Sequence, residues 1–189
     1  RVLSHDVPLF DSFAHKITGM AASISDVRAL VSQAFPVSLS ELKDLVRIPS
    51  VSWSSFDPEN VARSAEAVAE LARSTNLFED VHILRSQKSD SVELGQPAVV
   101  ARRNPAPGKP TVLLYAHHDV QPPGDLSVWE SEPFEPVEKS GRIYGRGAAD
   151  DKAGIMAHIS SLRLLSQLVD SIEVGIVLFV EGEEEFGSP

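Results

Sequence analysis

Residues 112–122 of the chain read VLLYAHHDVQP. The apolar run at 112–115 predicts a buried β-strand, and the prolines that follow prevent the strand from continuing. Between the two lie His117, His118 and Asp119. Because ligands of open α/β sheets bind at the carboxyl ends of the strands, these side chains are expected at an edge where a site can form. His117 and Asp119 share one side of the extended chain, which is typical of a metal-binding imidazole oriented by a carboxylate, although a hydrogen-bonded loop is the alternative.

A second polar segment, residues 145–154, reads GRGAADDKAG and leads into a predicted helix. A glycine-rich turn before a helix can bind phosphate, but this spacing matches no phosphate-binding pattern, and Asp150 and Asp151 would repel an anion. The helix dipole instead favours carboxylates at this position. The pair therefore either caps the helix or binds a cation.

The third polar segment, residues 181–187, reads EGEEEFG and follows the apolar run 174–180, which predicts another buried strand. A charge run is usually a solvated surface. Here, however, three apolar elements each adjoin ligand-type side chains. That combination suits a hydrolase in which carboxylates hold two metal ions and activate water.

Composition limits the possible functions. The chain has 189 residues, 42% of them hydrophobic, a formal net charge of −10 and no cysteine. The negative charge argues against nucleic acid and anionic membranes as partners. Because the chain has no cysteine, a metal would have to be held by nitrogen and oxygen, as suits zinc, manganese or cobalt.

No apolar run approaches the roughly 20 residues of a membrane span, and no signal-peptide pattern is present, so a cytoplasmic protein is predicted. Arg1 is not an initiator methionine, so the true start can lie upstream.

The N-terminal residues are predicted to be helical. Apolar residues from Phe13 to Val31 recur at spacings of three and four, including Ile17 and Met20, which predicts a long helix that ends before Pro36. A shorter helix is predicted from about residue 40 up to Ile48-Pro49, and another after the cap Asp57-Pro58. Further strands are predicted at 81–84 and 98–101, and a hairpin turn at 139–142.

The segments 116–122, 144–154 and 181–188 resemble the three motifs of the di-zinc metallopeptidase family that contains carnosinase, carboxypeptidase G, aminoacylase and succinyl-diaminopimelate desuccinylase. The segment 48–52, IPSVS, also resembles an early motif of that family. The resemblance implies an α/β catalytic domain of three layers, with a mixed, largely parallel sheet flanked by helices and cut off before a lid domain. Residues 1–37 would then be an N-terminal helical segment that packs on this domain, and 38–189 its N-terminal portion.

The resemblance also implies roles for individual residues. His117 would bind one zinc ion, Glu185 the other, and Asp150 both, through a carboxylate preceding a cis peptide bond. Asp119 would orient the imidazole, and Glu184 would be the general base. His118, Glu181 and Glu183 would lie outside the site.

The function expected from these motifs is zinc-dependent hydrolysis of a dipeptide or a C-terminal peptide bond, with two zinc ions, or manganese or cobalt, in the full-length enzyme. The alternatives are an N-acyl amino acid deacylase with the same machinery and a non-catalytic binding domain that retains the fold. The resemblance places the remaining ligands, and a lid domain that forms a homodimer, beyond Pro189. The chain alone is therefore expected to be inactive.

Overall fold

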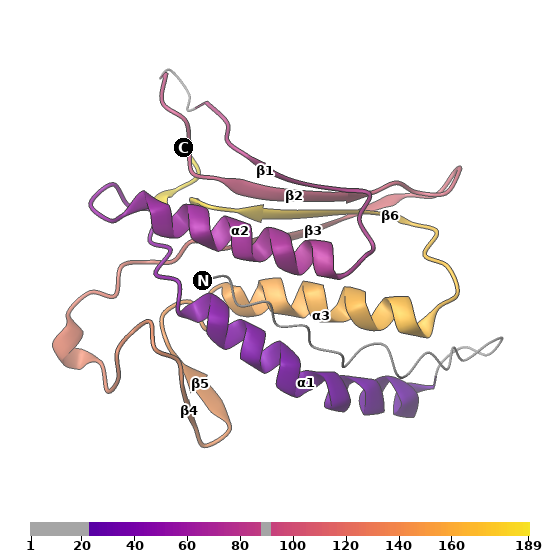
Figure 1. Ribbon diagram of the computed structural model, residues 1–189, viewed down its shortest axis with the longest axis horizontal. Helices are drawn as coiled ribbons and strands as arrows, with labels where there is room; N and C mark the ends of the chain where they lie inside the picture. The colour runs from indigo at the N-terminus through magenta and orange to yellow at the C-terminus, as the bar shows by residue number, and fades with distance from the viewer. Residues whose placement is uncertain (1–22, 88–91) are drawn as a thin grey trace, which may run out of the picture.

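The computed structural model describes residues 23–87 and 92–189 (Figure 1). This part of the chain forms a four-stranded sheet with three helices, and a separate two-stranded hairpin. The elements are α1 Ile24–Val46, α2 Pro58–Ser74, β1 Asp80–Leu84, β2 Ala98–Arg103, β3 Thr111–His117, η1 Leu126–Val128, β4 Val137–Lys139, β5 Arg142–Tyr144, α3 Lys152–Leu168, β6 Gly175–Glu181 and η2 Glu184–Phe186, where η denotes a 3₁₀ helix.

The main sheet has the strand order β1-β2-β6-β3. Strands β3 and β6 are parallel, as the apolar runs predicted, and His117 is paired in register with Glu181. The other two pairings, β1 with β2 and β2 with β6, are antiparallel. The sheet is therefore mixed, as expected, but in the described residues it is less parallel than the resemblance implied.

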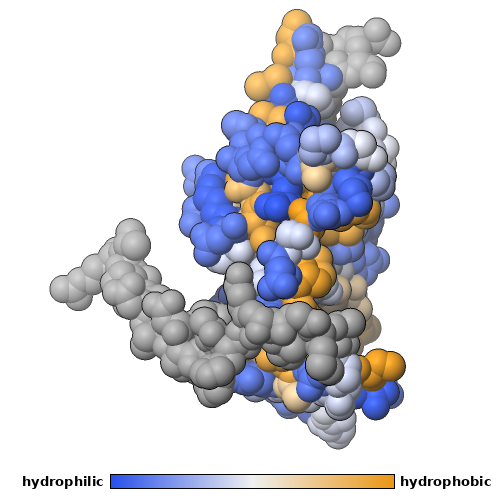
Figure 2. Space-filling model, turned by 90° about the vertical axis from the view of Figure 1, so that its right-hand side faces the viewer, coloured by the Kyte–Doolittle hydropathy of each residue, from blue (hydrophilic) through white to orange (hydrophobic). Residues whose placement is uncertain are grey.

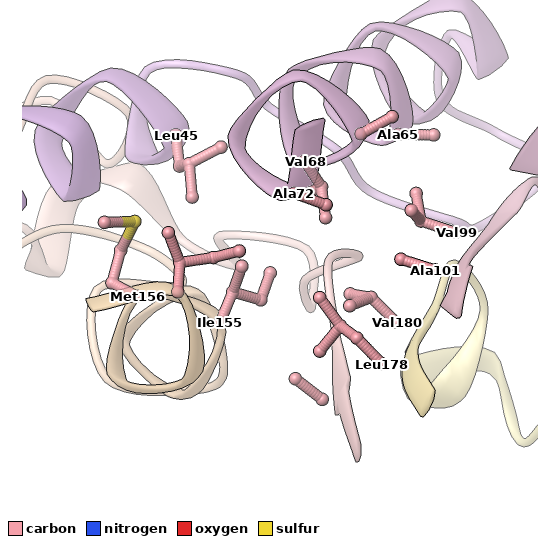
Figure 3. Close-up of a cluster of buried hydrophobic side chains, with 13 residues drawn as sticks. Leu45, Ala65, Val68, Ala72, Val99, Ala101, Ile155, Met156, Leu178 and Val180 are labelled. Atoms are coloured by element: carbon pink, nitrogen blue, oxygen red, sulfur yellow. The ribbon is translucent and has the colours of Figure 1, made fainter. Parts of the chain in front are cut away.

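The helices α1, α2 and α3 all lie on one side of the main sheet (Figure 1). Between the helices and the sheet lies a cluster of buried apolar side chains, drawn in Figure 3, to which α1 contributes Leu45, α2 Val68, α3 Ile155 and β6 Leu178. Alternation along β6 supports this arrangement, because Ile176, Leu178 and Val180 are buried while the residues between them are only half-buried. The mixed α/β fold class is confirmed, and the described residues supply two of its three expected layers.

One expectation about the helices is wrong. α1 is a single helix that runs through Pro36, whereas the sequence predicted one helix ending before Pro36 and another beginning near residue 40. A proline inside a helix has no N–H, so it removes one backbone hydrogen bond, here the bond to the carbonyl of Ser32. The loss of one bond does not end the helix. After Pro36 the helix packs on α3, where Ser38 and Ser160 hydrogen-bond at 2.8 Å and Leu45 enters the core. These contacts outweigh the proline penalty.

Other local predictions are confirmed. Asp57 caps α2 by accepting a hydrogen bond from the amide of Glu59 at 3.0 Å, and Pro58 occupies the first turn. The predicted turn near Ser140-Gly141 joins β4 to β5. The part of the predicted N-terminal helix that contains Phe13, Ile17 and Met20 lies outside the described residues. The division into segments 1–37 and 38–189 therefore stays a prediction, although residues 37 and 38 both lie within α1.

The surface is largely polar at the end of the molecule where α3 leads into β6. Figure 2 views this end and shows hydrophilic side chains with hydrophobic patches between them. Among the helices that the structure describes, none is both long and apolar enough to cross a membrane.

Candidate metal-binding site

The parallel pairing of β3 and β6 brings two of the polar segments to the same edge of the sheet. His117 ends β3 and Glu181 ends β6, so residues 117–121 and 182–186 leave the sheet side by side, toward the left in Figure 1. The start of α3 reaches the same edge, since Asp151 accepts a hydrogen bond from the backbone N–H of His117 at 3.2 Å. Three segments far apart in the sequence therefore converge, as the motifs predicted.

His117 lies at the centre of this edge. Its Nε2 is 3.1 Å from Asp150 Oδ1 and 3.8 Å from Glu184 Oε2. Ligand atoms of His117, Glu184 and Glu185 all lie within 4.8 Å of one another. Imidazole nitrogen with carboxylate oxygens is a donor set that suits zinc and neighbouring divalent ions, so the residues present fit a metal.

The predicted ligands are not equally placed. Asp150 contacts His117 through one oxygen, but its side chain is 78% exposed, and it is not part of the cluster formed by His117, Glu184 and Glu185. Glu184, predicted to be the base, lies within that cluster. The peptide bond between Asp150 and Asp151 is cis, as the resemblance implied.

Asp119 is fully buried and accepts hydrogen bonds from three directions. Ser52 Oγ donates to it at 2.7 Å, and the backbone amides of Glu184 and Glu185 donate at 3.2 and 3.0 Å. His117 Nδ1 lies 3.1 Å from the backbone carbonyl of Asp119 and 3.4 Å from its carboxylate. Asp119 therefore fixes the turn that carries Glu184 and Glu185 as well as the imidazole.

These contacts change the acidity of both groups. Burial by itself lowers the pKa of His117, but the hydrogen bonds and negative charge of Asp119 outweigh it and raise the pKa to about 9. For Asp119, burial by itself raises the pKa, and the donors His117, Ser52 and the amide of Glu185 outweigh it and lower the pKa below its usual value. In the metal-free protein His117 is thus a cation among carboxylates, and a metal ion would take the place of its proton.

His118 points away from this cluster, as strand alternation predicted. It is fully buried, and its Nε2 donates to the carbonyl of Pro97 at 2.8 Å. Burial lowers the pKa of His118 to about 4, so the ring is neutral near pH 7. A side chain on Gly182 would clash with the backbone carbonyl oxygen of Pro97 and come within 2.9 Å of His118 Nε2, so this position needs a glycine. The two adjacent histidines are both buried, but their surroundings shift their pKa values in opposite directions.

The other glutamates of the acidic run make contacts of their own. Glu181 accepts a hydrogen bond from the Tyr115 hydroxyl at 2.9 Å, and Glu183 is buried against Gly95. Neither residue is part of the cluster around His117.

Sequence reasoning missed the residues that support the site from other elements. Ser52 belongs to the motif at 48–52, which carries no sign that the Ser52 hydroxyl donates to Asp119. Lys152 is fully buried at the start of α3, and its ammonium group donates to the carbonyls of Leu45 and Ile48 at 2.8 and 2.7 Å. Burial lowers the pKa of Lys152 to about 7. This lysine ties the end of α1 to the turn that carries Asp150.

Comparisons with known proteins identify relatives of this chain. Residues 113–189 match the family described as Peptidase family M20/M25/M40. The Beta-Ala-His dipeptidase of Rattus norvegicus is 30% identical over 148 residues, which cover 72% of this chain and 30% of that protein. The structure of the dipeptidase Dug1p from Saccharomyces cerevisiae has a TM-score of 0.76 at 28% identity, covering 89% of this chain and 36% of that one.

The structure of human carnosine dipeptidase 1 has a TM-score of 0.72 at 28% identity, and covers 86% of this chain and 35% of that one. The chain thus spans about a third of the length of each of these relatives. The resemblance drawn from the three motifs is confirmed.

Proposed function

With residues 113–189 identified as a peptidase M20 domain, we propose that the protein hydrolyses a dipeptide or the C-terminal bond of a short peptide. The observation that carries this proposal is the gathering of His117, Glu184 and Glu185 within 4.8 Å at the ends of two parallel strands. The relatives described above are dipeptidases by name, which supports the same reaction.

In the proposed site His117, Asp150 and Glu185 would hold the metal, and Asp150 would serve as a ligand for both ions. Zinc is the proposed metal, and manganese and cobalt accept the same nitrogen and oxygen ligands. When bound, zinc would supply a Lewis acid that polarises the substrate carbonyl and lowers the pKa of water toward neutrality. The imidazole of His117 is held in place for metal binding, because Asp119 and Asp150 contact its two ring nitrogens.

Glu184 is proposed as the general base. Its backbone amide is fixed by Asp119, while its side chain is 44% exposed and approaches His117 Nε2 at 3.8 Å. A carboxylate held in this way can accept a proton from the attacking water and then deliver it to the leaving amine. Asp119 does not touch the substrate in this scheme but keeps the base and the imidazole in place.

The test is the variant Glu184→Gln in the full-length protein, assayed with dipeptides. Loss of general-base catalysis is expected to lower kcat by about 10²–10⁴-fold, while bound metal is retained. The matched control is Glu181→Gln, since Glu181 bonds Tyr115 and should leave kcat almost unchanged. If Glu184→Gln turned over dipeptides as fast as the wild type, Glu184 would not be the general base.

Two other functions use the same fold. An N-acyl amino acid deacylase would cleave acylated amino acids faster than any dipeptide, so both substrate classes belong in the assay. A non-catalytic binding domain would contain no metal even when the complete protein is supplied with zinc. A cytoplasmic location and a homodimer formed through a lid domain also stay proposals.

A further inference from the structure

The chain stays extended beyond the end of β3, and every second side chain in this segment contacts the η2 turn. His117, Asp119 and Gln121 lie two residues apart, so they share one side of the extended chain. Each contacts η2: His117 approaches the side chain of Glu184 at 3.8 Å, Asp119 accepts the amides of Glu184 and Glu185, and Gln121 contacts Glu185.

The residues between them face the opposite way. His118 donates to Pro97, and Val120 is fully buried, with its backbone N–H donating to the carbonyl of Ser50 at 3.0 Å. This side is packed against the rest of the chain, which fixes the backbone of the segment. The three side chains that face η2 therefore project from a rigid support.

Gln121 makes two hydrogen bonds to a single residue. Its Nε2 donates to the Glu185 carboxylate oxygen Oε2 at 2.7 Å and to the Glu185 backbone carbonyl at 3.0 Å. A side-chain amide has two N–H donors, and both are used here. Rotation of either the Gln121 amide or the Glu185 carboxylate would break this arrangement. Gln121 thus holds one oxygen of the Glu185 carboxylate, Oε2, in a fixed direction.

The carboxylates around Glu185 explain why its side chain needs the restraint that Gln121 provides. Glu185 shares its surroundings with the carboxylates of Glu184 and Asp119, and Asp150 approaches the same ring nitrogen of His117 as Glu184 does. Like charges at short range repel one another, and an unrestrained glutamate on a turn could relieve the repulsion by rotating into solvent. The amide of Gln121 opposes this rotation without adding a charge.

We propose that Gln121 is a positioning residue that holds Glu185 in the orientation in which it binds metal. The inference rests on the proposed function in taking Glu185 as a metal ligand, and adds to it the group that orients this ligand. Loss of a hydrogen bond to a metal ligand typically weakens metal binding by about 10–100-fold.

The experiment compares Gln121→Met and Gln121→Glu with the wild type in the full-length protein. Methionine keeps the approximate size of glutamine but has no donor, and glutamate replaces the donor by a negative acceptor. Zinc affinity is measured by competition with a chromogenic chelator, and ligand geometry by the visible absorption spectrum of the cobalt-substituted protein. Zinc affinity is expected to fall about 10-fold in Gln121→Met and about 100-fold in Gln121→Glu, with a changed cobalt spectrum in both.

Two controls separate positioning from packing. Gln167→Ala removes an exposed glutamine on α3 that donates only to the helix backbone, and should bind zinc like the wild type. The melting temperature of metal-free Gln121→Met should also stay close to that of the wild type, since its packing volume is kept.

The outcomes separate this inference from the proposed function. Wild-type zinc affinity and an unchanged cobalt spectrum in both Gln121 variants would overturn the inference and leave the proposed function standing. A wild-type protein that binds neither zinc nor cobalt would overturn the proposed function itself.

Discussion

At the scale of single residues, two adjacent histidines show how the side of an extended chain on which a side chain lies determines its pKa. Burial lowers the pKa of His118 to about 4, whereas Asp119 outweighs burial and raises the pKa of His117 to about 9. His118 thus binds its proton more weakly in the folded state than in the unfolded chain. Its contribution to stability is fully present above pH 6.5 and is lost as the pH falls through about 4.

We therefore expect the variant His118→Gln to lose less stability in acid than the wild type does. The difference between the two proteins should approach, and not exceed, about 3 kcal/mol of unfolding free energy. The measurement is urea unfolding of the metal-free protein at several pH values between about 4 and 9. His117→Gln is the matched control, because the raised pKa of His117 contributes stability below pH 6.5 that is lost as the pH rises through about 9. This variant should be less stable than the wild type below pH 6.5, but its slope of stability against pH should differ only between about pH 6.5 and 9. Equal acid slopes in His118→Gln and wild type would contradict the prediction.

Residue types and alternation were enough to predict that His117, Asp119 and the acidic run after the 174–180 strand gather at the sheet edge. The choice of Glu184 and Glu185 within that run came from the family resemblance. The supporting residues could not be found in this way. Lys152 contacts Leu45 across 107 positions of sequence, and Ser52 contacts Asp119 across 67. A serine or lysine carries no local pattern that indicates such a distant partner, so only the folded chain reveals these contacts.

At the scale of elements, α1 shows where a local rule fails. Proline is the least favourable residue in a helix interior, which is why the sequence predicted a break at Pro36. The N-terminal half of α1 is mostly exposed and is stabilised mainly by local interactions, such as the capping box that Ser23 and Asp26 form. The C-terminal half packs on α3 and enters the core, and this packing makes the helix continuous. The predicted positions of the strands agree with the structure. The prediction that residues 112–115 are buried is wrong, however, because Val112, Leu113 and Tyr115 are 45%, 62% and 46% exposed.

We expect the variant Pro36→Ala to stabilise the protein. Alanine restores the backbone N–H that can bond to the Ser32 carbonyl and fits the helix without a ring clash. The unfolding free energy should rise by about 1–3 kcal/mol, with more helical signal in circular dichroism. Pro58→Ala is the matched control, because Pro58 lies in the first turn of α2, where a backbone N–H has no partner within the helix. A stability change equal to or larger than that of Pro36→Ala in this control would contradict the explanation.

At the scale of the whole molecule, the described helices cover one face of the sheet only (Figure 1). On the other face Leu113 is 62% exposed and Tyr115 is 46% exposed, although their neighbours Leu114 and Ala116 pack into the core. The positions of most strands and helices could be predicted from apolar runs and periodicity, and the fold class followed from the resemblance of the three motifs to a known family. The one-sided layering could not, since exposure of a strand face depends on which other elements lie against it.

The last prediction concerns the metal capacity of the polypeptide Arg1–Pro189 when it is produced alone. A catalytic zinc ion generally has three protein ligands and one open position, so two ions that share a single carboxylate need five protein groups. The proposed ligands His117, Asp150 and Glu185 are three, and Glu184 is reserved as the base. Since binding energy depends on ligands that are already arranged, loss of ligands should weaken binding severely.

We therefore expect this polypeptide to bind less than two equivalents of zinc after dialysis and to show no dipeptide hydrolysis above background. Bound metal is measured by elemental analysis, and turnover is compared with that of the full-length protein in the same assay. The variant His117→Ala is the control for specific binding, because it removes the only imidazole in the candidate cluster of the described residues and should abolish whatever zinc the polypeptide retains. Two equivalents of bound zinc together with turnover near that of the full-length protein would contradict the prediction. Such a result would mean that groups outside the proposed set, in this chain or in a second copy of it, complete the site.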